Sequence, residues 1–126
     1  MSALGKNKPY VLVVDDDRAV RESLKFALEL EGLRVATCEG AAELLRHPDL
    51  ACCNCLVLDQ KMPVMDGLTL MGELAARGVA IPTILITSSV NEGLRSRASK
   101  AGVFAVLEKP LLDNILAQNV RRATVH

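Results

Sequence analysis

Aromatic residues are nearly absent from this sequence. Its 126 residues include no tryptophan, one tyrosine and two phenylalanines, although half of the residues are hydrophobic. The core must therefore consist of aliphatic side chains, a mixture that suits buried parallel strands covered by helices. A chain of this length fits one core and is too short for two ordinary domains. We expect a single domain over residues 1–126, with a core from about residue 10 to residue 122.

The sequence also lacks an excess of charge and a long apolar run. Fifteen basic and fifteen acidic residues cancel, so no overall field attracts nucleic acid or an anionic membrane. The apolar stretch at residues 51–60 is interrupted by Asp59 and is far shorter than a membrane span. The first residues carry no apolar run with a cleavage site. These absences predict a cytoplasmic protein that binds neither nucleic acid nor a membrane directly.

Cysteines are few, and nothing suggests a disulfide framework. The rest of the sequence does not resemble a small secreted scaffold, so we interpret all four cysteines as reduced thiols. Cys52 and Cys55 have C-x-x-C spacing, which with His47 would also suit half a zinc site or a redox pair. A closed zinc site needs four ligands and a redox pair needs a helix start, whereas these cysteines lead into an apolar strand. Both remain minor alternatives.

Short apolar runs alternate with longer amphipathic segments, which is the pattern of repeated strand–helix units. Such units imply right-handed crossovers and a parallel sheet with helices on both faces, in the flavodoxin-like order 2-1-3-4-5. The expected strands are 10–14, 33–37, 55–58, 83–86 and 103–107.

Five helices are expected between and after these strands. Gly32, Gly78 and Gly102 should end three of them, because glycine accepts a left-handed cap conformation at little cost. In the third helix the inward face is expected to hold Leu68, Met71, Leu74 and Ala75. The helices are expected near residues 18–31, 41–46, 66–77, 94–101 and 112–122.

Polar residues end four of the strands at one rim of the predicted sheet. Asp15 and Asp16 follow the first strand, Asp59 the third, Thr87 the fourth and Lys109 the fifth. Ligands of such sheets bind beyond the carboxyl ends of the strands, where the strand order reverses. Three carboxylates gathered there would raise each other's pKa unless a cation lay among them.

Magnesium suits this acidic rim. It prefers oxygen ligands and is usually held by one or two carboxylates together with phosphate oxygens. Lys109 can neutralise a phosphoryl oxygen, and Thr87 can donate its hydroxyl to another. A carboxylate, a metal ion, a lysine and a hydroxyl are sufficient for phosphoryl transfer, which demands mostly positioning and charge stabilisation.

Each of these residues also suits a simpler structural role. Asp17 precedes the first helix and is interpreted as its N-cap. Thr87 with Ser88 and Ser89 could cap the next helix, and Lys109 could be an ordinary surface lysine. Because these residues occur together at the ends of successive strands, the functional interpretation is favoured.

Four segments together resemble the receiver domains of response regulators in two-component signalling. They are VLVVDDD at 11–17, LVLDQKMPVMDG at 56–67, ILIT at 84–87 and EKP at 108–110. Each segment is a weak signal alone, but the set in this order is specific. The resemblance covers about residues 10–122, nearly the whole chain.

The resemblance implies a role for each strand-end residue. Asp59 would be the phosphoacceptor, and the chain would be a signalling protein that assists its own phosphorylation and dephosphorylation rather than an enzyme. Thr87 and Lys109 would contact the phosphoryl group, while Lys61 and Ser89 would flank the path of the hydrolytic water. The Mg²⁺ ligands would be Asp16, Asp59, the backbone carbonyl of Lys61 and, through water, Asp15.

The resemblance also implies partners. A sensor histidine kinase would donate the phosphoryl group, and the output surface would be the fourth helix, the fifth strand and the fifth helix. Dimerisation through that surface is left open. The chain would be either a stand-alone receiver or the first domain of a longer regulator with an output domain. A cis peptide bond is implied before Pro110.

One position departs from the family pattern. Receivers usually have an aromatic residue three positions before the fifth-strand lysine, and here that position is Val106, which has no ring and a stiff χ1. Phe104 lies two residues earlier, on the same face of the strand by its period of two. We therefore expect the signal to travel chiefly through the loop from Thr87 to Glu92.

Three other functions compete with this one. A haloacid-dehalogenase-like phosphatase would use Asp15 as nucleophile, but it needs an acidic pair after the lysine, where only Asp113 occurs. A flavodoxin would need a phosphate-binding loop after the first strand. A receiver-like scaffold that is never phosphorylated would not need all three of Asp15, Asp16 and Asp59.

Overall fold

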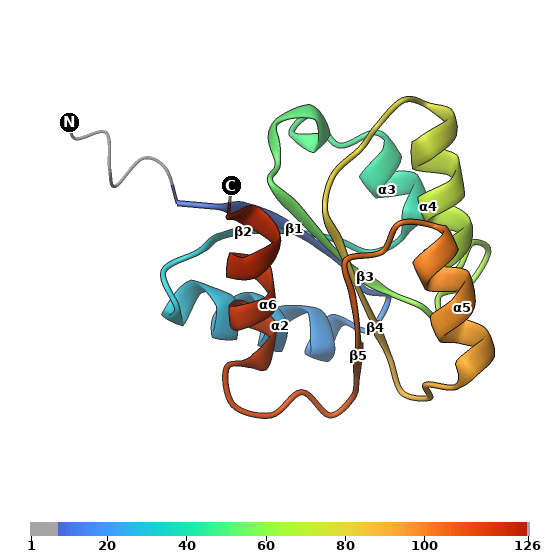
Figure 1. The fold of residues 1–126 in the computed structure, drawn as a ribbon. Helices are drawn as coiled ribbons and strands as arrows, with labels where there is room; N and C mark the ends of the chain where they lie inside the picture. Colours follow the sequence, from blue (N-terminus) through green and yellow to red (C-terminus); the bar gives the residue numbers. More distant parts are fainter. Residues whose placement is uncertain (1–7, 126) are drawn as a thin grey trace.

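A five-stranded parallel sheet forms the centre of the computed structural model, which describes residues 8–125 (Figure 1). The strand order is β2-β1-β3-β4-β5, so the predicted flavodoxin-like sheet is confirmed. The strands are β1 (Tyr10–Val14), β2 (Arg34–Cys38), β3 (Cys55–Asp59), β4 (Thr83–Thr87) and β5 (Ala105–Glu108).

Helices cover both faces of the sheet. In Figure 1, α2 (Arg18–Leu30) and α6 (Ile115–Thr124) lie on one face, and α3 (Ala41–Leu45), α4 (Gly67–Ala76) and α5 (Glu92–Lys100) lie on the other. Because successive strand residues point to opposite faces, two aliphatic cores result. Val13 and Val57 belong to the core under α2 and α6, whereas Leu12 and Leu58 belong to the core under α3, α4 and α5. A short 3-10 turn, Leu50–Cys52, precedes β3.

Glycine ends three of the helices as predicted. Gly32, Gly78 and Gly102 have φ values of 87°, 75° and 83°, the left-handed conformation that glycine adopts most readily. Among residues 8–125, no helix combines the length and the apolar character that crossing a membrane requires.

Two of the expected helix details are wrong. The last helix begins at Ile115 rather than at Leu112, because Asp113 has a positive φ of 54° and interrupts helical geometry. In α4 the most buried side chains are Leu70, which was not predicted, and Leu74, which was. Leu68 and Met71 are half-buried against the same core as predicted, but Ala75 is exposed. β2 and β5 are shifted toward the C-terminus, and β3 and β4 end one residue later than expected.

Candidate functional site

The three aspartates expected to bind magnesium lie together at the carboxyl ends of β1 and β3. Pairing of the two strands ends with Val14 opposite Leu58, so the next residues, Asp15 and Asp59, are neighbours. One ligand oxygen from each of Asp15, Asp16 and Asp59 lies within 4.8 Å of the others. Asp15 and Asp59 are buried, whereas Asp16 is exposed.

Lys109, which directly follows the edge strand β5, also reaches this cluster. Its Nζ lies 3.4 Å from Oδ1 of Asp59 and 3.5 Å from Oδ2 of Asp15. The backbone N–H of Lys109 donates to the Thr87 carbonyl at 2.8 Å, which extends the β4–β5 pairing to the lysine. The expected cis peptide bond between Lys109 and Pro110 is present.

Burial and charge set the protonation of Asp59. Burial raises the pKa of its carboxyl group, and the neighbouring Asp15 carboxylate raises it further. The Lys109 ammonium and the backbone amide of Lys61 act in the opposite direction and lower this pKa. One lysine therefore offsets only part of the repulsion between two buried carboxylates.

Asp15 carries an oxygen with no hydrogen-bond donor. Its Oδ1 accepts from the Asp17 backbone N–H at 2.9 Å, but its Oδ2 is buried without a hydrogen-bond partner. Lys109 Nζ, at 3.5 Å from Oδ2, is beyond ordinary hydrogen-bond length. An orphaned carboxylate oxygen beside two other carboxylates fits a hard divalent cation held directly or through water.

Buried and capping residues fix the turn after β1. The guanidinium of Arg21, a buried side chain of α2, donates to the backbone carbonyl of Asp15 at 2.8 Å. Asp17 accepts from the Val20 N–H and is the N-cap of α2, as predicted. Arg21 was not singled out from the sequence. Its signal is its spacing with Leu24 and Leu28, which places a charged residue on the inward face of the helix.

The Thr87 hydroxyl is engaged with its own loop. It donates to the Ser89 carbonyl at 3.4 Å and accepts from the Ser89 N–H at 3.3 Å. Asn91, not Thr87, is the N-cap of α5 and accepts from the Leu94 N–H at 2.8 Å. The alternative of Thr87 as a helix cap is therefore wrong.

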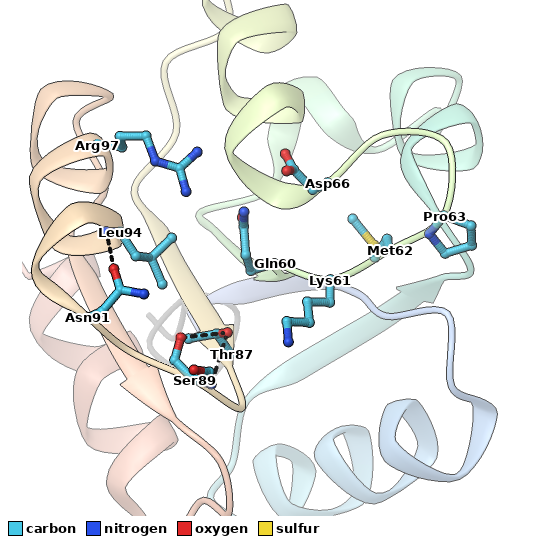
Figure 2. Close-up of a pocket in the computed structure, with 10 residues that line it drawn as sticks. All are labelled: Gln60, Lys61, Met62, Pro63, Asp66, Thr87, Ser89, Asn91, Leu94 and Arg97. Atoms are coloured by element: carbon cyan, nitrogen blue, oxygen red, sulfur yellow. Dashed lines mark hydrogen bonds between the residues drawn. The ribbon is translucent and has the colours of Figure 1, made fainter.

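A groove of about 680 Å³ lies between the loop after β3 and the start of α5. Figure 2 shows Lys61, Thr87 and Ser89 at one end and Arg97 and Asp66 at the other. The groove is lined by Gln60 and Lys61, the two residues that follow Asp59, but not by any of the three aspartates.

Two positions outside the acidic cluster bear on other expectations. Val106 is half-buried, packs in the core under α5 and pairs with Leu85 of β4. Phe104 is exposed and lies before β5 begins, so it does not supply the missing buried ring.

All four cysteines are free thiols, as predicted. Burial raises the pKa of Cys55 to about 12, which disfavours the thiolate that metal binding or redox exchange requires. His47 Nδ1 already accepts from the Asp49 N–H at 3.0 Å. Within the described part of the chain, the one group of potential ligands with metal-site spacing is the aspartate cluster.

Comparison with known proteins gives a consistent result. A family model described as response regulator receiver domain matches residues 11–121. The transcriptional regulatory protein FixJ of Azorhizobium caulinodans is 41% identical over 111 residues, 88% of this chain and 53% of FixJ. DctD of Pseudomonas aeruginosa, a C4-dicarboxylate transport transcriptional regulatory protein, is 38% identical over 117 residues, 90% of this chain and 24% of DctD.

A solved structure agrees with these relatives. The crystal structure of FixJ-N has a TM-score of 0.85 at 35% identity and covers 95% of this chain and 96% of its own. This chain spans between about a quarter and about a half of the length of the curated relatives.

Proposed function

This chain belongs to the response regulator receiver family of two-component systems, and on that premise we propose that a histidine kinase phosphorylates it on Asp59 in a Mg²⁺-dependent reaction. The observation that carries the proposal is the cluster of three carboxylates within 4.8 Å, with Lys109 3.4 Å from Asp59. We further propose that residues 1–126 act as a single receiver domain.

Asp16, Asp59 and the Lys61 backbone carbonyl would hold Mg²⁺, with Asp15 acting through water. When bound, Mg²⁺ would neutralise the negative charge on the phosphoryl oxygens. The orphaned Oδ2 of Asp15 supports this assignment because it needs a cation or an ordered water.

The transfer itself uses the side chains at the strand ends. The Asp59 carboxylate attacks phosphorus, the bond from phosphorus to the donor nitrogen breaks, and the imidazole leaves. Lys109 would exchange its contact with Asp59 for a phosphoryl oxygen, and Thr87 would donate its hydroxyl to another. Lys61 and Ser89 would then control how readily water attacks the acyl phosphate.

Thr87 would leave Ser89 to reach the phosphoryl group, and that movement would change the loop leading to α5. With Val106 in place of an aromatic ring, we propose that the loop from Thr87 to Glu92 transmits the signal to the surface of α5, β5 and α6. Backbone amide chemical shifts of residues 87–100 should change on phosphorylation. Unchanged shifts there would contradict this route.

Partners and location are part of the same proposal. Since FixJ and DctD are named transcriptional regulatory proteins, we propose a cytoplasmic receiver that controls an output domain, either attached to it or separate. A sensor histidine kinase would be its donor. Dimerisation through α5, β5 and α6 belongs to the same proposal.

Incubation with acetyl phosphate and Mg²⁺ tests the phosphorylation. The chain should gain one acid-stable, base-labile phosphoryl group on Asp59, and the Asp59→Asn variant should gain none. Absence of phosphorylation in the unchanged chain would indicate a binding scaffold. Turnover that needs Asp15 but not Asp59 would indicate a phosphatase.

A further inference from the structure

Gln60, the residue directly after the phosphoacceptor candidate, is a buried polar side chain that the sequence reasoning left unexplained. It is 8% exposed. Its own N–H donates to the Ile86 carbonyl at 2.8 Å, which anchors it to β4. A glutamine buried at the end of a strand needs partners for its side-chain amide, because an unpaired buried amide is costly.

Those partners lie at the start of α4. The Gly67 N–H donates to the backbone carbonyl of Gln60 at 3.0 Å, and the Leu68 N–H donates to its side-chain Oε1 at 2.9 Å. The first N–H groups of a helix have no acceptors within the helix. Here one residue supplies acceptors for two of them, while Asp66 accepts from Thr69 as the N-cap.

Both ends of the loop 61–66 are consequently tied to one residue. The loop leaves Gln60, carries the Lys61 carbonyl that would bind Mg²⁺, and returns to Gln60 at Gly67. Its tip includes Val64, which is fully exposed, whereas Met62 is buried in the core under α3, α4 and α5. Packing holds the first part of the loop, and the two Gln60 bonds tie its return at Gly67 and Leu68 to its start.

We propose that Gln60 is a positioning residue, whose side-chain bond to the Leu68 N–H holds the loop 61–66 so that the Lys61 carbonyl is preorganised for Mg²⁺. The proposal rests on the metal-binding role given to Lys61 above. A loop that is already ordered loses less conformational freedom on binding, and a pre-positioned ligand binds more tightly for that reason.

The side-chain nitrogen of Gln60 offers a competing explanation. In Figure 2 it points into the groove between Arg97 and Asp66. If this nitrogen were the important atom, any variant lacking it would behave alike. The acceptor oxygen and the nitrogen can therefore be separated by substitution.

Two variants separate them. Gln60→Met has a similar length but no acceptor, so it should leave the Leu68 N–H unsatisfied. Gln60→Glu keeps an acceptor oxygen at the same reach and removes the nitrogen. The control is Asn91→Ala, which deletes a side-chain bond to a helix N–H of the same kind, at the start of α5.

Mg²⁺ affinity, followed by NMR titration of the unphosphorylated protein, is the main measurement. Gln60→Met should bind Mg²⁺ about two- to tenfold more weakly, the span that corresponds to one lost hydrogen bond. Hydrogen exchange of the Leu68 amide should be faster in the same variant. Gln60→Glu should bind at least as tightly as the unchanged chain, and Asn91→Ala should bind equally tightly.

Phosphorylation by acetyl phosphate gives a second readout. In Gln60→Met the Mg²⁺ concentration needed for half the maximal rate should rise, while the rate at saturating Mg²⁺ stays within about twofold, because only preorganisation is lost. A general structural defect would lower the saturated rate as well.

Three outcomes would overturn the inference: Gln60→Met binding Mg²⁺ like the unchanged chain, Gln60→Glu weakened as much as Gln60→Met, or Asn91→Ala weakened equally. Failure of the proposed function looks different. The unchanged chain would then bind Mg²⁺ with the expected dependence on Gln60 and yet accept no phosphoryl group on Asp59.

Discussion

The surroundings of Asp59 disfavour the ionised form of its carboxyl group. Burial and the nearby Asp15 raise the pKa of its carboxyl group in the folded chain. The ionised form is therefore less favourable in the folded state than in the unfolded state. This unfavourable contribution is absent below the unfolded pKa of about 3.9 and is complete once the pH exceeds the folded pKa.

Asp59→Asn should therefore stabilise the metal-free protein at neutral pH. The variant removes one of two repelling carboxylates, and Asp15 still accompanies Lys109. The gain in free energy of unfolding should be largest near pH 7, should shrink as the pH falls through the folded pKa, and should vanish below the unfolded pKa of about 3.9, where the carboxyl group is neutral in both states. Chemical denaturation with a chelator present measures it. An equal gain at both pH values would place the cause elsewhere.

Val64 has an unusual backbone for its residue type. Its φ is 72° and its side chain is fully exposed. The left-handed conformation costs an L-residue about 1–2 kcal/mol and is a genuine outlier for a β-branched one. No burial of the side chain offsets this cost.

Val64→Gly should increase the free energy of unfolding by about 1 kcal/mol, the relief of strain less the greater freedom of glycine in the unfolded chain. Val64→Ala removes the branching but keeps Cβ, so its gain should be smaller. Chemical denaturation of the three proteins provides the comparison. A loss of stability in Val64→Gly would mean that the loop depends on the valine side chain.

Sequence reasoning located the strand-end residues but not the residues that support them. Asp59 and Lys109 stand directly beyond apolar runs, so the order of the strands was enough to bring them to one rim. The side chains of Gln60 and Arg21 form hydrogen bonds with backbone groups of Leu68 and Asp15. Which backbone groups they meet depends on the paths of the loops between these residues, which local sequence patterns do not encode. The left-handed φ of Val64 has no sequence signal at all, because glycine or asparagine would be expected there.

At the scale of elements, the approach of α4 to the sheet depends on the absence of a side chain at its first residue. A Cβ at Gly67 would lie 2.7 Å from the Leu85 Cδ1 and 2.9 Å from the Asp59 carbonyl oxygen. The second of these is backbone and cannot turn away. Gly72, in the middle of the same helix, has open space where a Cβ would be.

These two glycines make a matched pair of variants. Gly67→Ala should lower the free energy of unfolding by about 1–3 kcal/mol, because α4 must move away from β3. Gly72→Ala should raise it by about 1 kcal/mol through helix propensity alone. Thermal unfolding of both variants measures the difference. Equal effects would show that the contact at Gly67 is relieved without cost.

Helix and strand identities followed from the sequence more reliably than their ends. Alternation of apolar runs with amphipathic segments established five strands and five helices, and glycine stops located three helix ends. The start of α6 could not be found, since Leu112 continues the apolar spacing although Asp113 has left-handed backbone geometry.

For the whole molecule, the sheet order places the acidic residues of β1 and β3 side by side while leaving their charge only partly compensated. A ligand that binds the folded chain alone raises its stability with concentration. A divalent cation at this site should therefore stabilise the entire domain and not only the loops that touch it.

Mg²⁺ at about one hundred times its dissociation constant should add about 2.7 kcal/mol to the free energy of unfolding. Thermal unfolding in Mg²⁺ and in chelator measures the gain. Asp16→Asn should lose most of it, whereas Asp17→Asn, which keeps a capping side chain outside the cluster, should retain most of it. A gain that survives in Asp16→Asn would exclude Asp16 as a ligand.

If Thr87 contacts the phosphoryl group as proposed, its two contacts with Ser89 would set a threshold on spontaneous activation. A hydroxyl that moves toward Asp59 would have to break both contacts, so the resting ensemble would be biased against the signalling geometry before a donor arrives. The strength of this small turn would then set the background level of output. Substitutions in the turn would tune basal noise separately from the chemistry of phosphate capture.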